Sequence, residues 1–226
     1  MNIKKNTYWR KILFFDNFFI RLLYKNRIKI DKILNKNLLT KNITTILDIG
    51  TAPSIEKFEN VFIQNNQQKK NITVLSNVDC SILKKNFPEI KVLIGDGVDT
   101  TLPDNSFDLV HSSATIEHIG SEQKQINFIK ECIRISKKNV AIITPNRNFF
   151  IDFHTKIPFI HLLPKSFHRK LLRLIGDDFF SLEKNLNLLN LKDIQFFCKT
   201  LNITKYTIIY NYFMFMKSNI ILIIEK

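Results

Sequence analysis

Cysteine and long apolar runs are scarce in this chain of 226 residues. The three cysteines, Cys80, Cys132 and Cys198, lie far apart and are odd in number, which excludes a disulfide framework and a zinc-binding spacing and fits a reducing cytoplasm. No uninterrupted apolar stretch approaches the roughly 20 residues that a membrane span needs. No small-residue cleavage site follows the N-terminal lysines. We therefore expect a cytoplasmic protein without a signal peptide.

Acidic residues are also few, because 20 Asp and Glu stand against 34 Lys and Arg, and the formal net charge is +14. So basic a chain is compatible with a nucleic-acid partner or an anionic membrane surface. The lysines are scattered rather than gathered in one stripe, and the uncharged Asn is as over-used as Lys. This pattern favours a compositional bias of the whole proteome, so nucleic-acid binding is the minority interpretation.

Length and composition predict a single α/β domain with an appendage, since 45% of the residues are hydrophobic. We divide it into a helical lead-in (1–42), a core (43–150), a helical cap insertion (151–190) and a final helix with a hairpin (191–226). Within residues 7–39, apolar side chains recur at helical spacing, namely Ile12, Phe15, Phe18, Phe19, Leu22 and Leu23. We favour a helix packed on the domain, and a basic amphipathic helix lying on a membrane is the alternative.

Five short apolar segments predict strands at residues 43–49, 72–78, 91–95, 107–112 and 139–144. Each is rich in Val, Ile and Leu on both faces or nearly so, which is typical of buried parallel strands. A helix over 121–136, capped by Ser121, lies between the last two strands. Alternating elements of this kind predict a doubly wound parallel sheet with right-handed crossovers.

The end of the chain follows a different pattern. After a predicted helix over 191–201, two strand-like runs at 205–215 and 219–225 are separated only by Met216-Lys217-Ser218. A parallel crossover needs a dozen or more residues, so these two strands must form an antiparallel hairpin. The predicted fold is therefore a seven-stranded, mostly parallel sheet with a C-terminal antiparallel hairpin.

Acidic and small residues follow the first three predicted strands. Ligands of open α/β sheets bind beyond the carboxyl ends of the strands, which places four residues around one crevice: Asp48, Gly50, Asp79 and Asp96. Gly50 lets the chain turn without a Cβ in the way of a ligand. The carboxylate of Asp79 can accept from both hydroxyls of a ribose, and Asp96 with Gly97 is placed to meet an adenine edge.

A dinucleotide fits this crevice poorly. Its fingerprint requires G-x-G-x-x-G and an acidic residue about 20 residues further on. The chain instead has Gly50-Thr51-Ala52-Pro53-Ser54, with a single glycine, and Pro53 has no N–H to offer a pyrophosphate. The loop therefore favours a cofactor that carries no phosphate.

Residues 43–146 resemble the class I S-adenosylmethionine (SAM) methyltransferases, most closely the small-molecule group that includes ubiquinone-pathway enzymes. The resemblance rests on the glycine loop, the acids after the strands, the stretch Leu102-Pro103-Asp104-Asn105-Ser106-Phe107-Asp108 and the dipeptide Glu117-His118. It departs from the family at Ala52, where a second glycine is usual. The resemblance implies a Rossmann-like fold, SAM as cofactor, and cofactor contacts from Asp48, Gly50, Thr51, Asp79, Asp96, Gly97 and Ser112.

Methyl transfer is an in-line displacement in which the protein aligns the nucleophile and removes water. A hydroxyl acceptor would also benefit from a base. We take His118 and His154 as the candidate catalytic residues, and we interpret His111 as a satisfied histidine of the core. Packing and hydrogen bonding in the strand-end loop is the alternative role for Glu117 and His118.

Three histidines in the second half of the chain raise the question of a metal site. His161 and His168 are seven residues apart and would share a helix face, and with His154 they suggest a ligand set. No carboxylate or Cys joins them at ligand spacing, so we predict no metal. For the apolar and basic segment 157–165, a cover over an apolar substrate, a membrane-contact patch and a buried helix all stay open.

The leading hypothesis is a cytoplasmic SAM-dependent methyltransferase that acts on a small-molecule acceptor at oxygen, with lipid-linked and saccharide acceptors both considered. Residues 112–115 lack the Asn-Pro-Pro-aromatic signature, which argues against methylation of adenine or glutamine nitrogen. The Ala52-Pro53 loop motivates one alternative, a catalytically degenerate scaffold domain. The net charge motivates another, a nucleic-acid methyltransferase. Peripheral membrane contact and the oligomeric state stay open.

Overall fold

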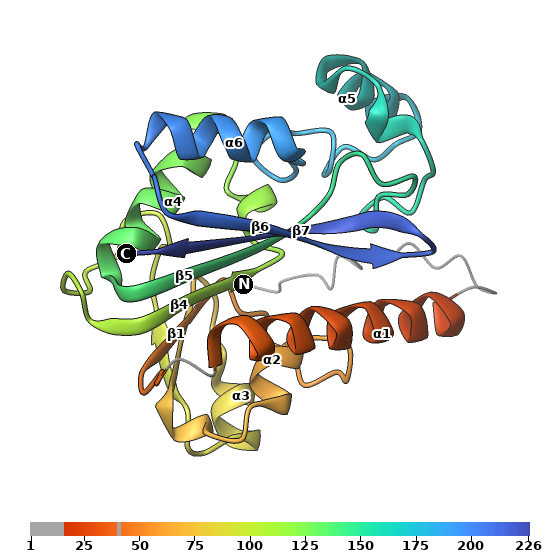
Figure 1. Ribbon diagram of the computed structural model, residues 1–226. Helices are drawn as coiled ribbons and strands as arrows, with labels where there is room; N and C mark the ends of the chain where they lie inside the picture. The colour runs from red at the N-terminus through yellow and green to blue at the C-terminus, as the bar shows by residue number, and fades with distance from the viewer. Residues whose placement is uncertain (1–15, 40–41) are drawn as a thin grey trace.

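A computed structural model describes residues 16–39 and 42–226, and it contains a seven-stranded sheet between two layers of helices (Figure 1). The strand order is β3-β2-β1-β4-β5-β7-β6. The five parallel strands are β1 (Ile46–Ile49), β2 (Ile72–Ser76), β3 (Lys91–Ile94), β4 (Phe107–Ser113) and β5 (Ser136–Pro145). β7 (Met216–Glu225) runs antiparallel to β5 and to β6 (Tyr206–Phe213). The predicted fold class is confirmed.

The hairpin between β6 and β7 turns earlier than the sequence predicts. Its turn consists of Met214 and Phe215, which adopt positive φ angles of 47° and 64°, whereas residues 216–218 belong to β7. Two central residues with positive φ match the right-handed twist of the flanking strands. The turn is hidden in the sequence because neither residue is a Gly, Asn or Asp.

Helices cover both faces of the sheet (Figure 1). One face carries α1 (Asp16–Leu34), its π-helical end at Asn35–Leu39, α2 (Val61–Asn65) and α3 (Ser81–Asn86). The other face carries α4 (Glu122–Ile135) and α6 (Leu191–Thr200). Short 3-10 turns at Lys69–Asn71 and Ile116–His118 complete the core region.

Side chains of the strands alternate between two separate hydrophobic cores. In β7, Ile220, Leu222 and Ile224 pack with α4 and α6, whereas Ile221 and Ile223 pack with the α1 and α2 side. All of these side chains are buried. A sheet buried on both faces explains why most strands read as nearly continuous apolar runs.

The two edge strands, β3 and β6, are the exceptions to this burial. Leu93 is 36% exposed and Ile94 is 69% exposed, because β3 pairs with a neighbour on one side only. The expectation that residues 91–95 form a strand is confirmed, and the expectation that this strand is buried on both faces is wrong. Lys91, at the start of β3, is also exposed, and a charged residue at a sheet edge discourages pairing with another chain.

Helix α1 packs on the domain, as the favoured interpretation of the lead-in predicts. Its buried residues Leu23, Ile30 and Leu34 recur at helical spacing, and the last two join the hydrophobic core beside α2. Positions 7–15 of the predicted helix lie outside the described residues. Within the described ranges, no helix is long and apolar enough to cross a membrane.

The segment between β5 and α6 has a small core of its own. It contains a 3-10 turn at Ile160–Leu162 and α5 (Lys165–Leu174), and Leu172, Phe180, Leu186 and Leu188 pack together there. In Figure 1, α5 lies beyond the end of the sheet rather than over either face. Helix α6 then begins with a capping box, in which Asn190 and Asp193 each accept a hydrogen bond from the other's backbone N–H.

Candidate functional site

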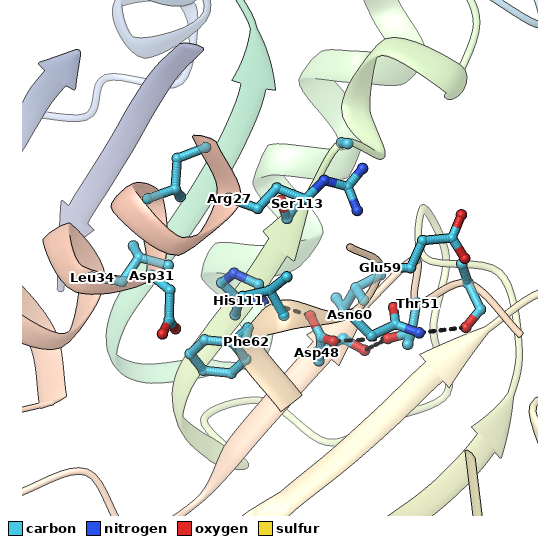
Figure 2. A pocket seen from close by; sticks show the side chains of 16 residues that line it. Arg27, Asp31, Leu34, Asp48, Thr51, Glu59, Asn60, Phe62, His111 and Ser113 are labelled. Carbon is cyan, nitrogen blue, oxygen red and sulfur yellow. Dashed lines mark hydrogen bonds and ion pairs between the residues drawn. The ribbon is translucent and has the colours of Figure 1, made fainter. Parts of the chain in front are cut away.

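A cavity of about 130 Å³ lies at the carboxyl ends of β1 and β4. Figure 2 shows Arg27 and Asp31 reaching it from α1, with Glu59 and Asn60 on the other side. Its remaining lining comes from the loop after β1, from Phe62 on α2 and from the end of β4. The cavity therefore lies where the topology of an open α/β sheet places ligands.

A buried network of polar side chains forms the floor of this cavity. One oxygen of Asp48 lies 2.6 Å from Nδ1 of His111, and the other accepts a hydrogen bond from the Thr51 hydroxyl at 2.9 Å. The imidazole of His111 also stacks on Phe62, with ring centroids 4.1 Å apart. His111 is thus a satisfied histidine as expected, although it also lines the cavity.

Gly50 is required where it stands, for a different reason from the one the sequence suggests. Its φ is +83°, and a Cβ added there would lie 2.2 Å from Oγ1 of Thr115. The space that the sequence reserves for a ligand beside Gly50 is therefore taken up in part by the Thr115 side chain. A Cβ at Gly97 would similarly lie 2.7 Å from Cγ2 of Ile49, so both glycines permit close packing at the end of β1.

An asparagine orders the loop that lacks further glycines. Asn60 adopts a left-handed conformation with a φ of 48° and donates from its side-chain amide to the carbonyls of Ala52 and Ser54, both at 2.8 Å. These two bonds fix the chain after Gly50 without a glycine at position 52. The loop is consequently an ordered wall of the cavity.

Four of the residues expected at the cofactor lie outside the cavity lining, namely Asp79, Asp96, Gly97 and Ser112. Asp79 and Asp96 are exposed, and their carboxylates accept from Ser81 at 2.9 and 3.0 Å and from the N–H of Val98 at 3.0 Å. Both residues follow strands at the same edge of the sheet as Gly50. Ser112 is buried, and its hydroxyl donates to the carbonyl of Ile49 at 3.0 Å.

A second group of ionisable side chains lies just beyond the end of β4. Glu117 is fully buried, and its Oε2 accepts from the Thr144 hydroxyl at 3.0 Å while Oε1 has no hydrogen-bond partner. That free oxygen lies 3.8 Å from Nε2 of His154, whose Nδ1 lies 2.8 Å from Asp152. The ring of His154 meets the ring of His118 edge-on, with centroids 4.8 Å apart. The two histidines named as candidate catalytic residues are therefore neighbours.

The surroundings of the two histidines shift their pKa values in opposite directions. Burial would lower the pKa of His154, but the ionised Asp152 raises it above the usual value. Burial and the nearby His154 lower the pKa of His118, whose Nδ1 donates to the carbonyl of Asn185 at 2.7 Å. Burial would raise the pKa of Asp152, yet His154 and Thr155 hold it well below its usual range. One imidazole thus favours the protonated form and its neighbour the neutral form.

The grouping of histidines differs from the one that the sequence suggests. His161 lies in the 3-10 turn and His168 in α5, so the two do not share a helix, although their ring centroids are 6.4 Å apart. Pro164 separates the two elements. His154 instead joins Glu117 and His118, so carboxylates do accompany it after all.

Sequence reasoning missed the contribution of α1 and of Asp152. Arg27 and Asp31 are four residues apart, on the side of the helix that also buries Ile30 and Leu34. Charged residues within an otherwise apolar helix face are a recognisable signal of a site. Asp152 carried no such signal, because its pairing with His154 depends on a turn in the loop after β5.

Comparison with protein families gives one match. A family model described as a methyltransferase domain matches residues 63–144, which run from α2 to the end of β5. The matched region includes Asp79, Asp96 and the Glu117-His118 dipeptide, and it begins after the Gly50 loop. A search of curated protein sequences finds no match.

Several solved structures of similar fold are described as SAM-dependent methyltransferases. One is an enzyme from Thermotoga maritima described as a possible histamine N-methyltransferase, with a TM-score of 0.58, 16% identity, and coverage of 94% of this chain and 96% of that chain. A SAM-dependent methyltransferase from Archaeoglobus fulgidus has a TM-score of 0.56 and 14% identity, covering 93% and 100%. The magnesium protoporphyrin IX methyltransferase of Synechocystis, solved with bound S-adenosylhomocysteine, has a TM-score of 0.55 and 10% identity, covering 90% and 84%. At such low identity, it is the TM-scores above 0.5 that show a shared fold.

Proposed function

We infer that this chain, a SAM-dependent methyltransferase by its matched domain and its fold, transfers a methyl group to oxygen of a small-molecule acceptor. One observation carries the proposal: the cavity at the end of β1 adjoins the histidine and carboxylate group at the end of β4. Ser113 and Ala114 line the cavity, and Glu117 follows three residues later. Arg27 also lines the cavity and interacts electrostatically with Glu117 and His154.

The residues of the cavity fit the amino-acid end of SAM. That end carries an ammonium group, a carboxylate and a sulfonium. Asp31, Asp48 and Glu59 line the cavity, and so does the cationic Arg27. Carboxylates accept hydrogen bonds from an ammonium and attract both positive charges. We assign contacts with this end of the cofactor to Asp48, Gly50 and Thr51.

The adenosine end lies outside the closed part of the cavity in our proposal. A volume of about 130 Å³ is smaller than the 300–1,000 Å³ that is common for ligand sites. The exposed carboxylate of Asp79 is then available to the ribose hydroxyls, and Asp96 with Gly97 to the adenine. Ser112 contributes from behind, because its hydroxyl holds β4 against the end of β1.

His118 and His154 are the groups that we assign to the acceptor. SAM supplies, when bound, an electrophilic methyl group on sulfur. Orientation of the acceptor and removal of its proton are the tasks left to the protein. Nδ1 of each imidazole is already hydrogen-bonded, which leaves Nε2. His118, whose pKa is lowered, is the one suited to take the proton, and His154, whose pKa is raised, is suited to orient the acceptor.

The cap segment supports an apolar or lipid-linked acceptor. Large apolar side chains are exposed on it, with Leu174 at 73%, Phe159 at 61% and Phe167 at 56%. Basic residues lie among them at Lys165, Arg169, Lys170 and Arg173. Such a surface suits an apolar molecule with an anionic group, and it also suits peripheral contact with a membrane. A saccharide acceptor has no comparable support.

The matched domain decides neither the subgroup of methyltransferases nor the cellular location. We propose membership of the small-molecule group that includes ubiquinone-pathway enzymes, on the strength of the Leu102-to-His118 stretch. We also propose a cytoplasmic location, because Cys80, Cys132 and Cys198 are all free and buried.

The test is incubation of the purified protein with methyl-labelled SAM and fractionated cell extract. We expect label in the small-molecule fraction, extracted into organic solvent if the acceptor is lipid-linked. Label confined to RNA or DNA would instead support a nucleic-acid methyltransferase. Binding of SAM with no labelled product in any fraction would support the degenerate scaffold.

A further inference from the structure

A triad of side chains beside the cavity has the composition of a metal site. Glu117, His118 and His154 each offer one ligand atom, and these atoms lie within 4.8 Å of one another. The triad combines one carboxylate with two imidazoles, which is the donor set of catalytic zinc sites and of non-haem iron sites with open positions. His118 and His154 are half-buried, so an ion and an acceptor could both reach them.

The hydrogen bonds around the triad orient its donors inward. Nδ1 of His154 is held by the buried carboxylate of Asp152 at 2.8 Å. Nδ1 of His118 donates to the carbonyl of Asn185 at 2.7 Å. Metal-binding histidines almost always use their second ring nitrogen in this way, which fixes the tautomer and leaves Nε2 for the metal.

An unpartnered oxygen points into the same triad. Oε1 of the fully buried Glu117 has no hydrogen-bond partner, although its other oxygen is satisfied by Thr144. A buried carboxylate oxygen without a partner is costly, because it has lost water and gained nothing in exchange. A cation between this oxygen and Nε2 of His154, now 3.8 Å apart, would remove that cost.

The charges around the triad are nearly balanced without a metal. One member of the triad, Glu117, is a buried carboxylate, and the buried carboxylate of Asp152 lies beside another member, His154. Arg27 is the cationic side chain that interacts with the group, and its guanidinium already donates to the carbonyl of Phe58 at 2.8 Å. Protonated His154 is the second cation of the group, so a metal ion would take the place of its proton, and metal binding should release that proton.

The geometry requires only a modest closure of the triad. Ligand atoms about 2.0–2.2 Å from a tetrahedral ion lie roughly 3.4 Å from one another. The separation of 3.8 Å between Glu117 and His154 is already close to this value. The widest separation in the triad, 4.8 Å, must shrink by more than an ångström, which rotation of the half-buried His118 can supply.

We propose that Glu117, His118 and His154 bind a divalent first-row transition-metal ion that holds the acceptor oxygen. This inference rests on the proposed function for the identity of the acceptor and deepens it, because such an ion selects an acceptor whose oxygen can be a ligand. A hydroxyl bound to the ion loses its proton to water more readily, as water bound to zinc does. The imidazoles then hold the ion and do not take the proton.

Metal binding can be measured on the full chain with neither cofactor nor acceptor. Protein treated with a chelator and then freed of it is titrated with Zn²⁺ by calorimetry, and with Co²⁺ by visible absorption. We expect about one equivalent to bind, and Glu117→Gln and His118→Ala each to weaken binding at least tenfold. Asp152→Asn, which removes the partner of His154 and no ligand, should weaken it about 10–100-fold.

Two matched controls keep the test decisive. Glu122→Gln removes an exposed carboxylate from the start of α4, and His168→Gln removes a histidine of the cap, so both should bind Zn²⁺ as the unmodified chain does. If Glu117→Gln does not fold, the half-buried His118→Ala carries the comparison. The proposal is overturned if no equivalent binds, if the triad variants bind normally, or if His168→Gln loses binding equally. Titration of the metal-free protein with S-adenosylhomocysteine tests the proposed function separately.

Discussion

At the scale of single residues, the candidate site depends on contacts between neighbouring strands and on contacts within the loops that follow them. Asp48 and His111 come from adjacent strands, and Asp152 and His154 come from one loop. The sequence identifies Asp48 as a site residue because it lies at a strand end beside a glycine. It identifies neither the Asp48 and His111 pair nor the gathering of Glu117 with His154. Both depend on strand register and on the path of a loop, which no local pattern encodes.

Gly50 provides a prediction at this scale. Gly50→Ala should lower the free energy of unfolding by at least about 2 kcal/mol, because a side chain at a φ of +83° is strained and the new Cβ would overlap Thr115. Urea denaturation followed by circular dichroism measures the change. In the background of Gly50→Ala, Thr115→Ala should restore part of the loss, since it removes the overlap and leaves the strain. An unfolding free energy within about 0.5 kcal/mol of the unmodified chain would contradict this account.

At the scale of elements, apolar patterns located the seven strands and the helices α1, α4 and α6, and they missed the short helices α2 and α3. They succeeded for β1, β2, β4 and β5 because both faces of the sheet are covered by helices. The apolar pattern was less accurate where neighbouring elements do not cover the sheet. β3 is an exposed edge, and the hairpin turn at Met214 and Phe215 is made of apolar residues that read as strand. The cap could not be predicted beyond its existence, because Pro164 divides what looks like one helix.

Helix α4 provides a prediction about pH at this scale. Hydrogen bonds from Arg134, opposed by burial and assisted by Thr100, lower the pKa of Glu131 to about 2. A lowered pKa in the folded state means that the stabilisation is present above pH 4.5 and is lost as the pH falls toward 2. Glu131→Gln should therefore cost roughly 2–3 kcal/mol of unfolding free energy near neutral pH. This deficit should shrink steadily as the pH falls through that range.

Urea denaturation at a series of pH values measures the Glu131 effect. Glu122→Gln is the matched control, because Glu122 lies exposed at the other end of the same helix. The control should show no deficit that depends on pH in this window. A deficit of Glu131→Gln that stays constant down to about pH 2 would show that the ionised form of Glu131 is not what Arg134 and Thr100 stabilise.

At the scale of the whole molecule, helices cover both faces of the sheet, so the ionisable side chains of the candidate site gather at the carboxyl ends of the strands. The carboxyl ends of β1, β2, β3 and β4 carry Asp48, Asp79, Asp96 and the Glu117 group. The alternation of strands and helices was sufficient to predict this side of the sheet, since it makes the strands parallel, and parallel strands have their carboxyl ends on the same side. The acceptor was not predictable to the same degree. It depends on which apolar side chains of the cap are exposed, and in an irregular segment no periodic pattern shows this.

Binding of S-adenosylhomocysteine, measured by isothermal titration calorimetry, tests the central claim most directly. We predict one site per chain, weakened at least tenfold by Asp79→Ala, because the ribose hydroxyls lose a charged acceptor. Glu89→Ala removes an exposed acid at the opposite end of β3 and should leave binding unchanged. No binding of the unmodified chain at millimolar ligand, or equal binding by Asp79→Ala, would contradict the proposed cofactor site.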